Sequence, residues 1–368
     1  MKKLLCVGLI LLSIISMSCQ KKSANQGAIV DMGVTVCLLT DSSGVDDKSF
    51  NAAAWRGILE FYGDTSANQR QLGTAYRWLS ASDDSMYVST LRQATDEGYD
   101  LIIVNGFSWA DALAEVSADN PEQKYLIVDV DWVEAGKILQ AAYAEHEGSY
   151  LVGVIAALKA QEDGIVNPRF GFIGGEAGAV ITKFEVGYVQ GIHSVIPGAQ
   201  IIDFYVNDWN DAGKAKTQAM NWYDSGVYAI FSAAGNSGNG TIAQAKEYRV
   251  AGRNVWAIGV DSDQYEEGLY NATESAVLTS MLKRVENSVL YALNAVKNDT
   301  FNSEVIVFDL KAEGVGYSAA NSALSKNIID RLEVVKSQIS SGQITIAATL
   351  ADAMRLPGFP RNLNAIDD

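Results

Sequence analysis

Acidic, glycine-rich and aromatic residues recur in this sequence close behind short apolar runs. Asp41, Asp129 and Asp261 each follow such a run, and a Gly-Asn-Ser-Gly-Asn-Gly segment begins at Gly235. Carboxylates accept hydrogen bonds from hydroxyl and ring N–H groups, and the face of an aromatic ring such as Phe50 stacks on a planar ring. These residue types suit an uncharged, planar ligand that carries a sugar. A phosphorylated ligand would instead require Arg or Lys.

The composition disfavours several other functions. The 28 Lys and Arg residues face 44 Asp and Glu residues, and the net charge of −16 argues against binding to nucleic acid. Only two histidines are present, His146 and His193, which leaves few candidates for a general base or a His-rich metal site. We therefore expect a binding protein that is not an enzyme and needs no cofactor or metal.

Two of the polar segments also have a purely structural interpretation. Asp46 and Asp47 precede a predicted helix, where carboxylates commonly cap the first turn. The glycine-rich segment at Gly235 lacks the Lys and Ser/Thr that end a phosphate-binding P-loop. A tight turn from strand to helix is therefore the better interpretation of that segment.

Short β-branched and aromatic runs alternate with stretches that have helical spacing of apolar residues, a pattern typical of parallel sheets covered on both faces. The predicted strands fall into two series, at residues 34–40, 74–79, 101–105 and 125–130, and at 169–174, 200–206, 228–233 and 254–260. The predicted helices include residues 49–62, 85–97, 179–195, 212–224 and 241–247. The fold class is therefore α/β, with two doubly wound parallel-sheet domains.

Later segments, at 277–282 and 304–308, supply one strand to each sheet, so the chain must cross between the domains several times. The predicted boundaries are 33–143 plus 277–303 for the N-terminal lobe, 144–276 plus 304–350 for the C-terminal lobe, and 351–368 for a tail. Residues 136–143 are expected to form the first crossing. Ligands of open α/β sheets bind at the carboxyl ends of the strands, which predicts a site in the cleft between the lobes.

The first residues have the pattern of a targeting segment. Lys2 and Lys3 precede an apolar run at 4–15 that is too short for a bilayer of about 30 Å. The cysteine at position 19 resembles the lipidation site of bacterial lipoproteins, with an ordinary secretory signal as the alternative. We expect a signal peptide at 1–18, a lipidated Cys19 with a tether at 19–32, and a body anchored to a membrane of the cell envelope. Cys37, in an apolar strand, is then expected to be a buried structural thiol.

The run Leu-Thr-Asp-Ser-Ser-Gly-Val-Asp-Asp-Lys-Ser-Phe-Asn at 39–51, with Ala-Trp-Arg-Gly at 54–57, resembles the signature of the basic membrane protein family. Segments 127–129, 184–191, 233–238, 259–261 and 280–284 extend the resemblance over nearly the whole mature chain. Members are lipoprotein substrate-binding components of ABC importers with a type I periplasmic-binding fold. The branch that the chain resembles most is the purine nucleoside receptor.

This resemblance implies a set of ligand-binding residues. Asp41 and Asp129 match family residues that contact the purine, and Phe50 matches an aromatic residue that stacks on it. Asp261 and Lys283 match residues that hold the ribose hydroxyls. The remaining expectations are Trp209 on the other face of the base, followed by Phe231 or Phe184, with Asn51 and Gly235 lining the pocket. Ser43 and Asn236 stand where the family commonly has Gly.

The resemblance implies adenosine, guanosine or inosine as ligand and an ABC permease as partner. Three alternatives remain open from the sequence, and one of them, a surface adhesin or antigen that binds a host macromolecule, has no sequence feature of its own. Another planar metabolite such as riboflavin could occupy the same cleft. An envelope nucleoside hydrolase could use the Asp46 and Asp47 carboxylates to hold a divalent cation.

Overall fold

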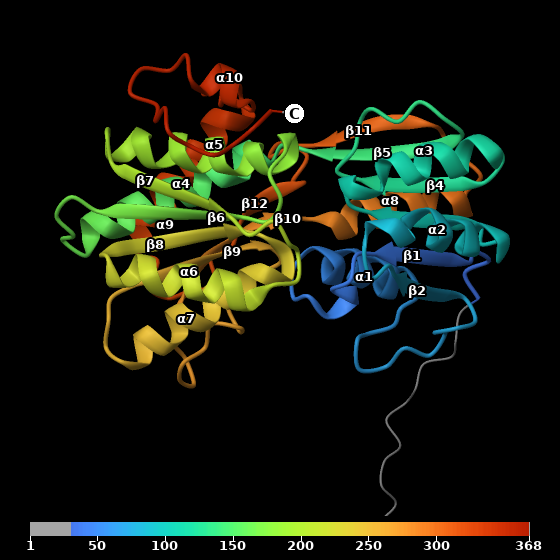
Figure 1. Cartoon of the computed structure of the whole chain (residues 1–368), viewed down its shortest axis with the longest axis horizontal. Coiled ribbons are helices and arrows are strands. Elements are labelled where there is room, and N and C mark those ends of the chain that lie inside the picture. Colours follow the sequence, from blue (N-terminus) through green and yellow to red (C-terminus); the bar gives the residue numbers. More distant parts are fainter. Residues whose placement is uncertain (1–30, 368) are drawn as a thin grey trace, which may run out of the picture.

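The N-terminal lobe is built on a six-stranded sheet, which the computed structural model shows together with the rest of residues 31–367 (Figure 1). All pairings are parallel. The strand order is β11-β5-β4-β3-β1-β2, with β1 (Val36–Thr40), β2 (Tyr76–Ser80), β3 (Leu101–Asn105), β4 (Lys124–Val128), β5 (Lys137–Tyr143) and β11 (Glu304–Phe308). Every residue of β1 and β3 is buried, because helices cover both faces of the sheet.

The helices of this lobe form two pairs. On one face, α1 (Phe50–Phe61) packs against α8 (Val285–Lys297), and on the other α2 (Tyr87–Asp96) packs against α3 (Ala110–Asp119). Cys37 of β1 is fully buried, and burial raises the pKa of its thiol to about 12. This agrees with a structural role, since a thiol in that state does not form the reactive thiolate.

The C-terminal lobe repeats the arrangement with the strand order β12-β10-β9-β8-β6-β7 (Figure 1). Only the short β12 (Val315–Tyr317) runs antiparallel to its neighbour. The other strands are β6 (Arg169–Gly174), β7 (Gln200–Tyr205), β8 (Val227–Ala233), β9 (Trp256–Asp261) and β10 (Val277–Lys283). Helices α4 (Glu145–Glu162), α5 (Ala179–Val195) and α9 (Lys326–Ser340) lie on one face, and α6 (Ala212–Asp224) and α7 (Asn239–Val250) on the other.

The expected α/β class with two doubly wound sheets is confirmed, but strands β10 and β11 each belong to the lobe opposite to the one expected. We expected residues 277–303 in the N-terminal lobe and 304–350 in the C-terminal lobe. Instead β10 pairs with β9 in the second sheet, and β11 pairs with β5 in the first. The chain therefore crosses after β5, after β10 and after β11. Residues 136–143, expected as a crossing, are mostly strand β5, which leaves the crossing itself at Ala144.

The C-terminal tail, from α10 (Leu350–Ala353) onward, folds back on the second lobe. Phe359 is buried, and the backbone N–H of Ile366 donates to Oγ1 of Thr182 on α5 at 3.1 Å. Among residues 31–367, no helix has the length and apolar run that crossing a bilayer requires. The predicted signal peptide and Cys19 lie outside the described residues.

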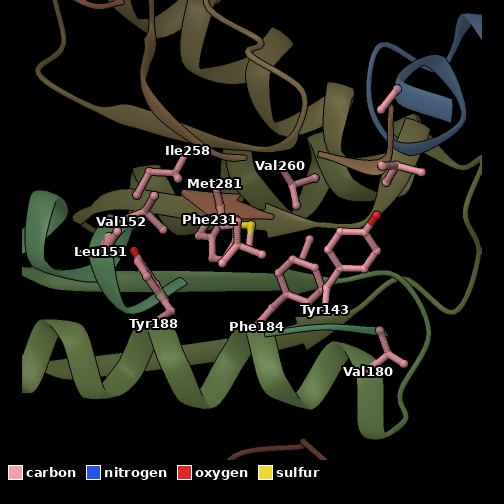
Figure 2. Packing of buried hydrophobic residues seen from close by; sticks show 14 of the residues in the cluster. Tyr143, Leu151, Val152, Val180, Phe184, Tyr188, Phe231, Ile258, Val260 and Met281 are labelled. Atoms are coloured by element: carbon pink, nitrogen blue, oxygen red, sulfur yellow. The ribbon is translucent and has the colours of Figure 1, made fainter. Parts of the chain in front are cut away.

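An aromatic core fills the space between α5 and the second sheet. Phe184 and Tyr188 of α5 face Phe231 of β8 (Figure 2), with ring centroids 6.3 and 5.3 Å from that of Phe231. All three residues are at most 2% exposed. This core fixes the position of α5 against the sheet. The contact between α5 and α4 constrains the helix further.

Helices α4 and α5 cross in close contact because glycines stand where they meet. A methyl group added at Gly191 would lie 2.1 Å from the carbonyl oxygen of Tyr150, and one added at Gly153 would lie 2.3 Å from that of Tyr188. Neither backbone can move without separating the helices. The spacing of the two helices therefore depends on the absence of side chains at these positions.

We predict that Gly191→Ala lowers the free energy of unfolding by about 1–3 kcal/mol, because the added methyl forces the two helices apart. Urea denaturation of the chain from residue 20 onward measures this change. Gly213→Ala in α6 is the matched control, since its nearest neighbour is the flexible side chain of Asp211 at 3.4 Å. Equal stability of both variants would contradict the interpretation of the helix crossing.

Candidate binding site

A cleft between the two lobes collects side chains from the carboxyl ends of strands in both sheets. Its empty space is about 610 Å³, a volume that includes space open to solvent. Seven of the nine expected ligand-binding residues line it: Asp41, Phe50, Asp129, Trp209, Gly235, Asp261 and Lys283. The expected location of the site therefore agrees with the structure.

The other two expected residues lie behind the wall of the cleft. Phe231 is fully buried in the aromatic core between β8 and α5 (Figure 2). Ala233 points to the same face of β8, but it ends the strand and lines the cleft, whereas Phe231 lies two residues before the strand end and is covered by α5. The expectation that Phe231 faces a ligand is therefore wrong. Phe184, the other alternative to Trp209, does line the cleft. Asn51 is 1% exposed and is bonded to Asp41 and Asn105.

The sequence-based prediction missed several residues that line the cleft. Asn105 ends β3, Phe107 and Trp109 follow it, and Tyr87 begins α2; the rings of Tyr87 and Trp109 are stacked with centroids 4.0 Å apart. The segment after β3 has the same position as the segments after β1 and β4, from which Asp41 and Asp129 were predicted. Applying the strand-end rule to β3 would have identified Asn105, Phe107 and Trp109.

A buried ion cluster forms the floor of the site where the lobes meet. The ammonium Nζ of Lys283 lies 2.5 Å from Oδ1 of Asp129 and 3.0 Å from Oε1 of Glu145. The side chain of Lys283 is 1% exposed, as is that of Glu145. Nζ also lies 5.1 Å from the ring centroid of Phe50. Asp129 and Phe50 belong to the N-terminal lobe and Lys283 and Glu145 to the C-terminal lobe, so the cluster joins the two.

The charges of this cluster determine its protonation. Burial alone would lower the pKa of Lys283, but the carboxylates of Asp129 and Glu145 raise it above its ordinary value. Burial raises the pKa of Asp129 to about 6 and that of Asp261 to about 7, although Lys283 opposes both rises. The pKa of Glu145 is raised by burial and lowered by Lys283 and Lys183, with a net decrease. Lys283 therefore remains charged and neutralises the carboxylates around it.

Asp129 and Asp261 also share an unusual backbone conformation. Asp129 directly follows β4 and Asp261 ends β9, the strand at the equivalent position in the other sheet, and their φ angles are +68° and +63°. Non-glycine residues rarely adopt this left-handed region, and such residues concentrate at functional sites. The turn directs both carboxyl groups toward the cleft that they line.

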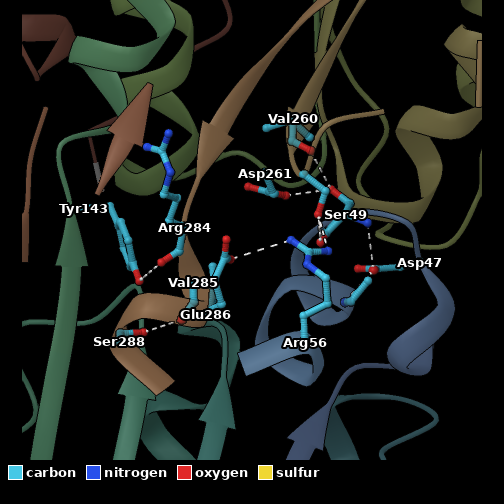
Figure 3. A network of polar contacts seen from close by, with 12 residues as sticks. Asp47, Ser49, Arg56, Tyr143, Val260, Asp261, Arg284, Val285, Glu286 and Ser288 are labelled. Carbon is cyan, nitrogen blue, oxygen red and sulfur yellow. Dashed lines mark hydrogen bonds and ion pairs between the residues drawn. The ribbon is translucent and has the colours of Figure 1, made fainter. Parts of the chain in front are cut away.

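Direct hydrogen bonds hold the lobes together beside the cleft (Figure 3). Oγ of Ser49 donates to Oδ2 of Asp261 at 2.7 Å, and Oγ of Ser262 donates to the carbonyl oxygen of Ser49 at 2.9 Å. Oδ1 and Oδ2 of Asp47 accept backbone N–H groups from Ser49, Asn51 and Ala52 at 2.8–3.0 Å, which agrees with the helix-capping interpretation of Asp47. The lobes are thus in contact across the site.

Trp209 reaches the cleft because Gly175 makes room for its ring. A methyl group on Gly175 would lie 2.1 Å from the indole, whereas one on Gly235 would lie at the ordinary contact distance of 3.6 Å. The edge of Trp209 meets Phe107 of the other lobe, with ring centroids 5.9 Å apart. Ser43, one departure from the family pattern, places Oγ 3.5 Å from the carbonyl oxygen of Trp209. Asn236, the other, donates to Asn210.

Comparisons with known proteins agree with this geometry. Residues 34–349 match the family model described as ABC transporter substrate-binding protein PnrA-like. The chain belongs to this family. It is a substrate-binding protein of the ABC transporter type, and the resemblance to the basic membrane proteins is confirmed.

Two relatives and one solved structure illustrate the similarity. A Listeria innocua protein named CD4+ T-cell-stimulating antigen is 37% identical over 90% of this chain and 92% of its own length. The ABC transporter nucleoside-binding protein BmpA of Lactococcus lactis is 32% identical over 86% of this chain and 90% of its own. An ABC transporter solute-binding protein of Aeropyrum pernix has the same fold, with a TM-score of 0.74, 23% identity, and coverage of 86% of this chain and 94% of its own.

The pKa of Asp261 makes stability depend on pH. Its pKa rises from the ordinary 3.8 to about 7 on folding, so between these values the folded protein keeps a proton that the unfolded chain releases. The free energy of unfolding therefore falls as pH rises through this window. We predict that Asp261→Asn reduces the decrease between pH 5 and pH 8 by roughly 1–3 kcal/mol.

Urea denaturation at both pH values measures this effect. Asp96→Asn, at an exposed position at the end of α2, is the control and should keep the wild-type decrease. If the free energy of unfolding of the Asp261→Asn variant fell as much as that of the wild type, the ionisation of Asp261 would not be coupled to folding.

Proposed function

We propose that this protein is a lipid-anchored receptor of the cell envelope that binds a purine nucleoside between its lobes and delivers it to an ABC permease. The observation that carries the proposal is that Phe50 and Trp209, from different lobes, line one cleft together with Asp41, Asp129 and Asp261. The name of the Lactococcus lactis relative, a nucleoside-binding protein, supports the ligand class. The sequence pattern around Cys19 supports the anchor.

The chemistry of the cleft favours an uncharged ligand. Lys283 is its only Lys or Arg among the described lining residues, and the carboxylates of Asp129 and Glu145 already neutralise it. A phosphate group would therefore meet three further carboxylates, those of Asp41, Asp47 and Asp261, without a free cation. Ribose hydroxyls, by contrast, can donate to carboxylates and accept from the ammonium group.

Binding and closure are coupled in this proposal. Each lobe carries one part of the site, so a ligand that contacts both lobes stabilises the closed form. Stacking on aromatic rings contributes about 1–3 kcal/mol per base, and hydrogen bonds to charged groups about 1.5–3 kcal/mol each. After ordering costs, a net ~8 kcal/mol corresponds to micromolar affinity.

Isothermal titration of the chain from residue 20 onward tests the proposal. We expect one-to-one binding of adenosine, guanosine or inosine with micromolar or tighter affinity. Binding of riboflavin or a simple sugar, without binding of any of these nucleosides, would contradict the proposed ligand class.

We predict that Phe50→Ala and Trp209→Ala each weaken nucleoside binding by roughly tenfold to a hundredfold, because each removes one aromatic wall. The same titration measures the loss. Trp132→Ala is the matched control, since Trp132 is 53% exposed and lies outside the cleft lining. Unchanged affinity in both cleft variants would exclude stacking of the base between Phe50 and Trp209.

A further inference from the structure

Asn105, the last residue of β3, has an amide oxygen with no hydrogen-bond partner among the described residues. The residue is 3% exposed and lines the cleft. Its Nδ2 donates to Oδ1 of Asn51 at 2.8 Å, and Nδ2 of Asn51 donates to Oδ1 of Asp41 at 3.2 Å. A buried acceptor without a partner is unfavourable, and native proteins rarely leave one unpaired unless it has a function.

The chemistry of the three residues fixes the orientation of the Asn105 amide. An ionised carboxylate only accepts hydrogen bonds, so Asn51 must present its NH₂ group to Asp41. The oxygen of Asn51 then faces Asn105, and Asn105 must present its own NH₂ group to that oxygen. The amide oxygen of Asn105 therefore has no partner in the described part of the chain and faces away from Asn51. Rotating the amide to present its NH₂ group there would break the hydrogen bond to Asn51.

The position of Asn105 places this acceptor beside the proposed stacking surface. A methyl group on the next residue, Gly106, would lie 3.6 Å from Cε1 of Phe50, so the backbone after Asn105 runs along the edge of the Phe50 ring. Of the residues that follow along the wall, Phe107 and Trp109 offer no side-chain acceptor, and Ser108 offers only a hydroxyl. A flat ring stacked on Phe50 would thus bring its edge to the strand end that carries Asn105.

We propose that Asn105 determines specificity by accepting a hydrogen bond from an N–H group on the edge of the base. The cleft then prefers purine nucleosides with an exocyclic amino group or a ring N–H over those without either. This inference depends on the proposed function and adds to it the feature of the base that is recognised. Asn51 acts as a positioning residue: its hydrogen bond to Asp41 fixes its own orientation, and its amide oxygen then orients the Asn105 amide.

Adenosine and purine riboside provide the test, since both have the same ring system and ribose but only adenosine has N–H groups on its base. By isothermal titration, the wild-type protein should bind adenosine at least about tenfold more tightly than purine riboside. In Asn105→Leu this ratio should fall about tenfold, while the affinity for purine riboside changes less than threefold. If Asn105 had only a structural role, the substitution would lower the affinity for both ligands equally.

The control is Asn298→Leu, the same substitution at an exposed position at the end of α8, which should keep the wild-type ratio. Thermal unfolding checks that each variant is folded, and Asn105→Ala replaces Asn105→Leu if the latter is not. Equal wild-type affinity for both ligands, or equal weakening of both in the Asn105 variant, would overturn the specificity role alone. Failure of the wild-type protein to bind either nucleoside would overturn the proposed function as well.

Discussion

The burial of the Lys283 ammonium between carboxylates of the two lobes is the constraint on which the closed site depends. Removing one partner of a buried ion pair costs about 3–5 kcal/mol, because the remaining charge stays buried without compensation. Asp129 directly follows β4 of the first sheet, Glu145 begins α4 directly after the first crossing, and Lys283 ends β10 directly before the second. The cluster therefore fixes the geometry at the point where the chain passes between the lobes.

This cluster also explains how an acidic cleft can exist in a protein of net charge −16. Several carboxylates face the same space, and burial raises the pKa of Asp261 to about 7 and that of Asp47 to about 6. Such groups are costly to ionise without a partner. Ligand hydroxyl and N–H groups can donate further hydrogen bonds to these carboxyl groups, which makes the residues suitable for binding.

The sequence predicted the fold class and most of the site because both depend on local patterns. Strand ends of parallel sheets meet at one edge, so Asp41, Asp129 and Asp261 could be placed together without coordinates. The failures depend on information that a single sequence lacks. Which sheet takes β10 or β11 is decided by pairing between distant segments, and apolar strands of similar length look alike.

Two further residues show the same limit at the scale of side chains. Phe231 lies in the core because it stands two residues before the end of β8 and is covered by α5, and the sequence alone does not show which helix covers that part of the strand. Glu145 is an essential partner of Lys283, but it lies at the start of a helix after a crossing, where nothing in the sequence marks a site. Long-range packing, and not residue type, assigns both roles.

A crystal structure of the protein with adenosine would test the central claim most directly. The account predicts the base between Phe50 and Trp209 and the ribose hydroxyls in contact with Asp261 and Lys283, so that one ligand touches both lobes. Adenosine bound to a single lobe, or bound outside the cleft, would contradict it.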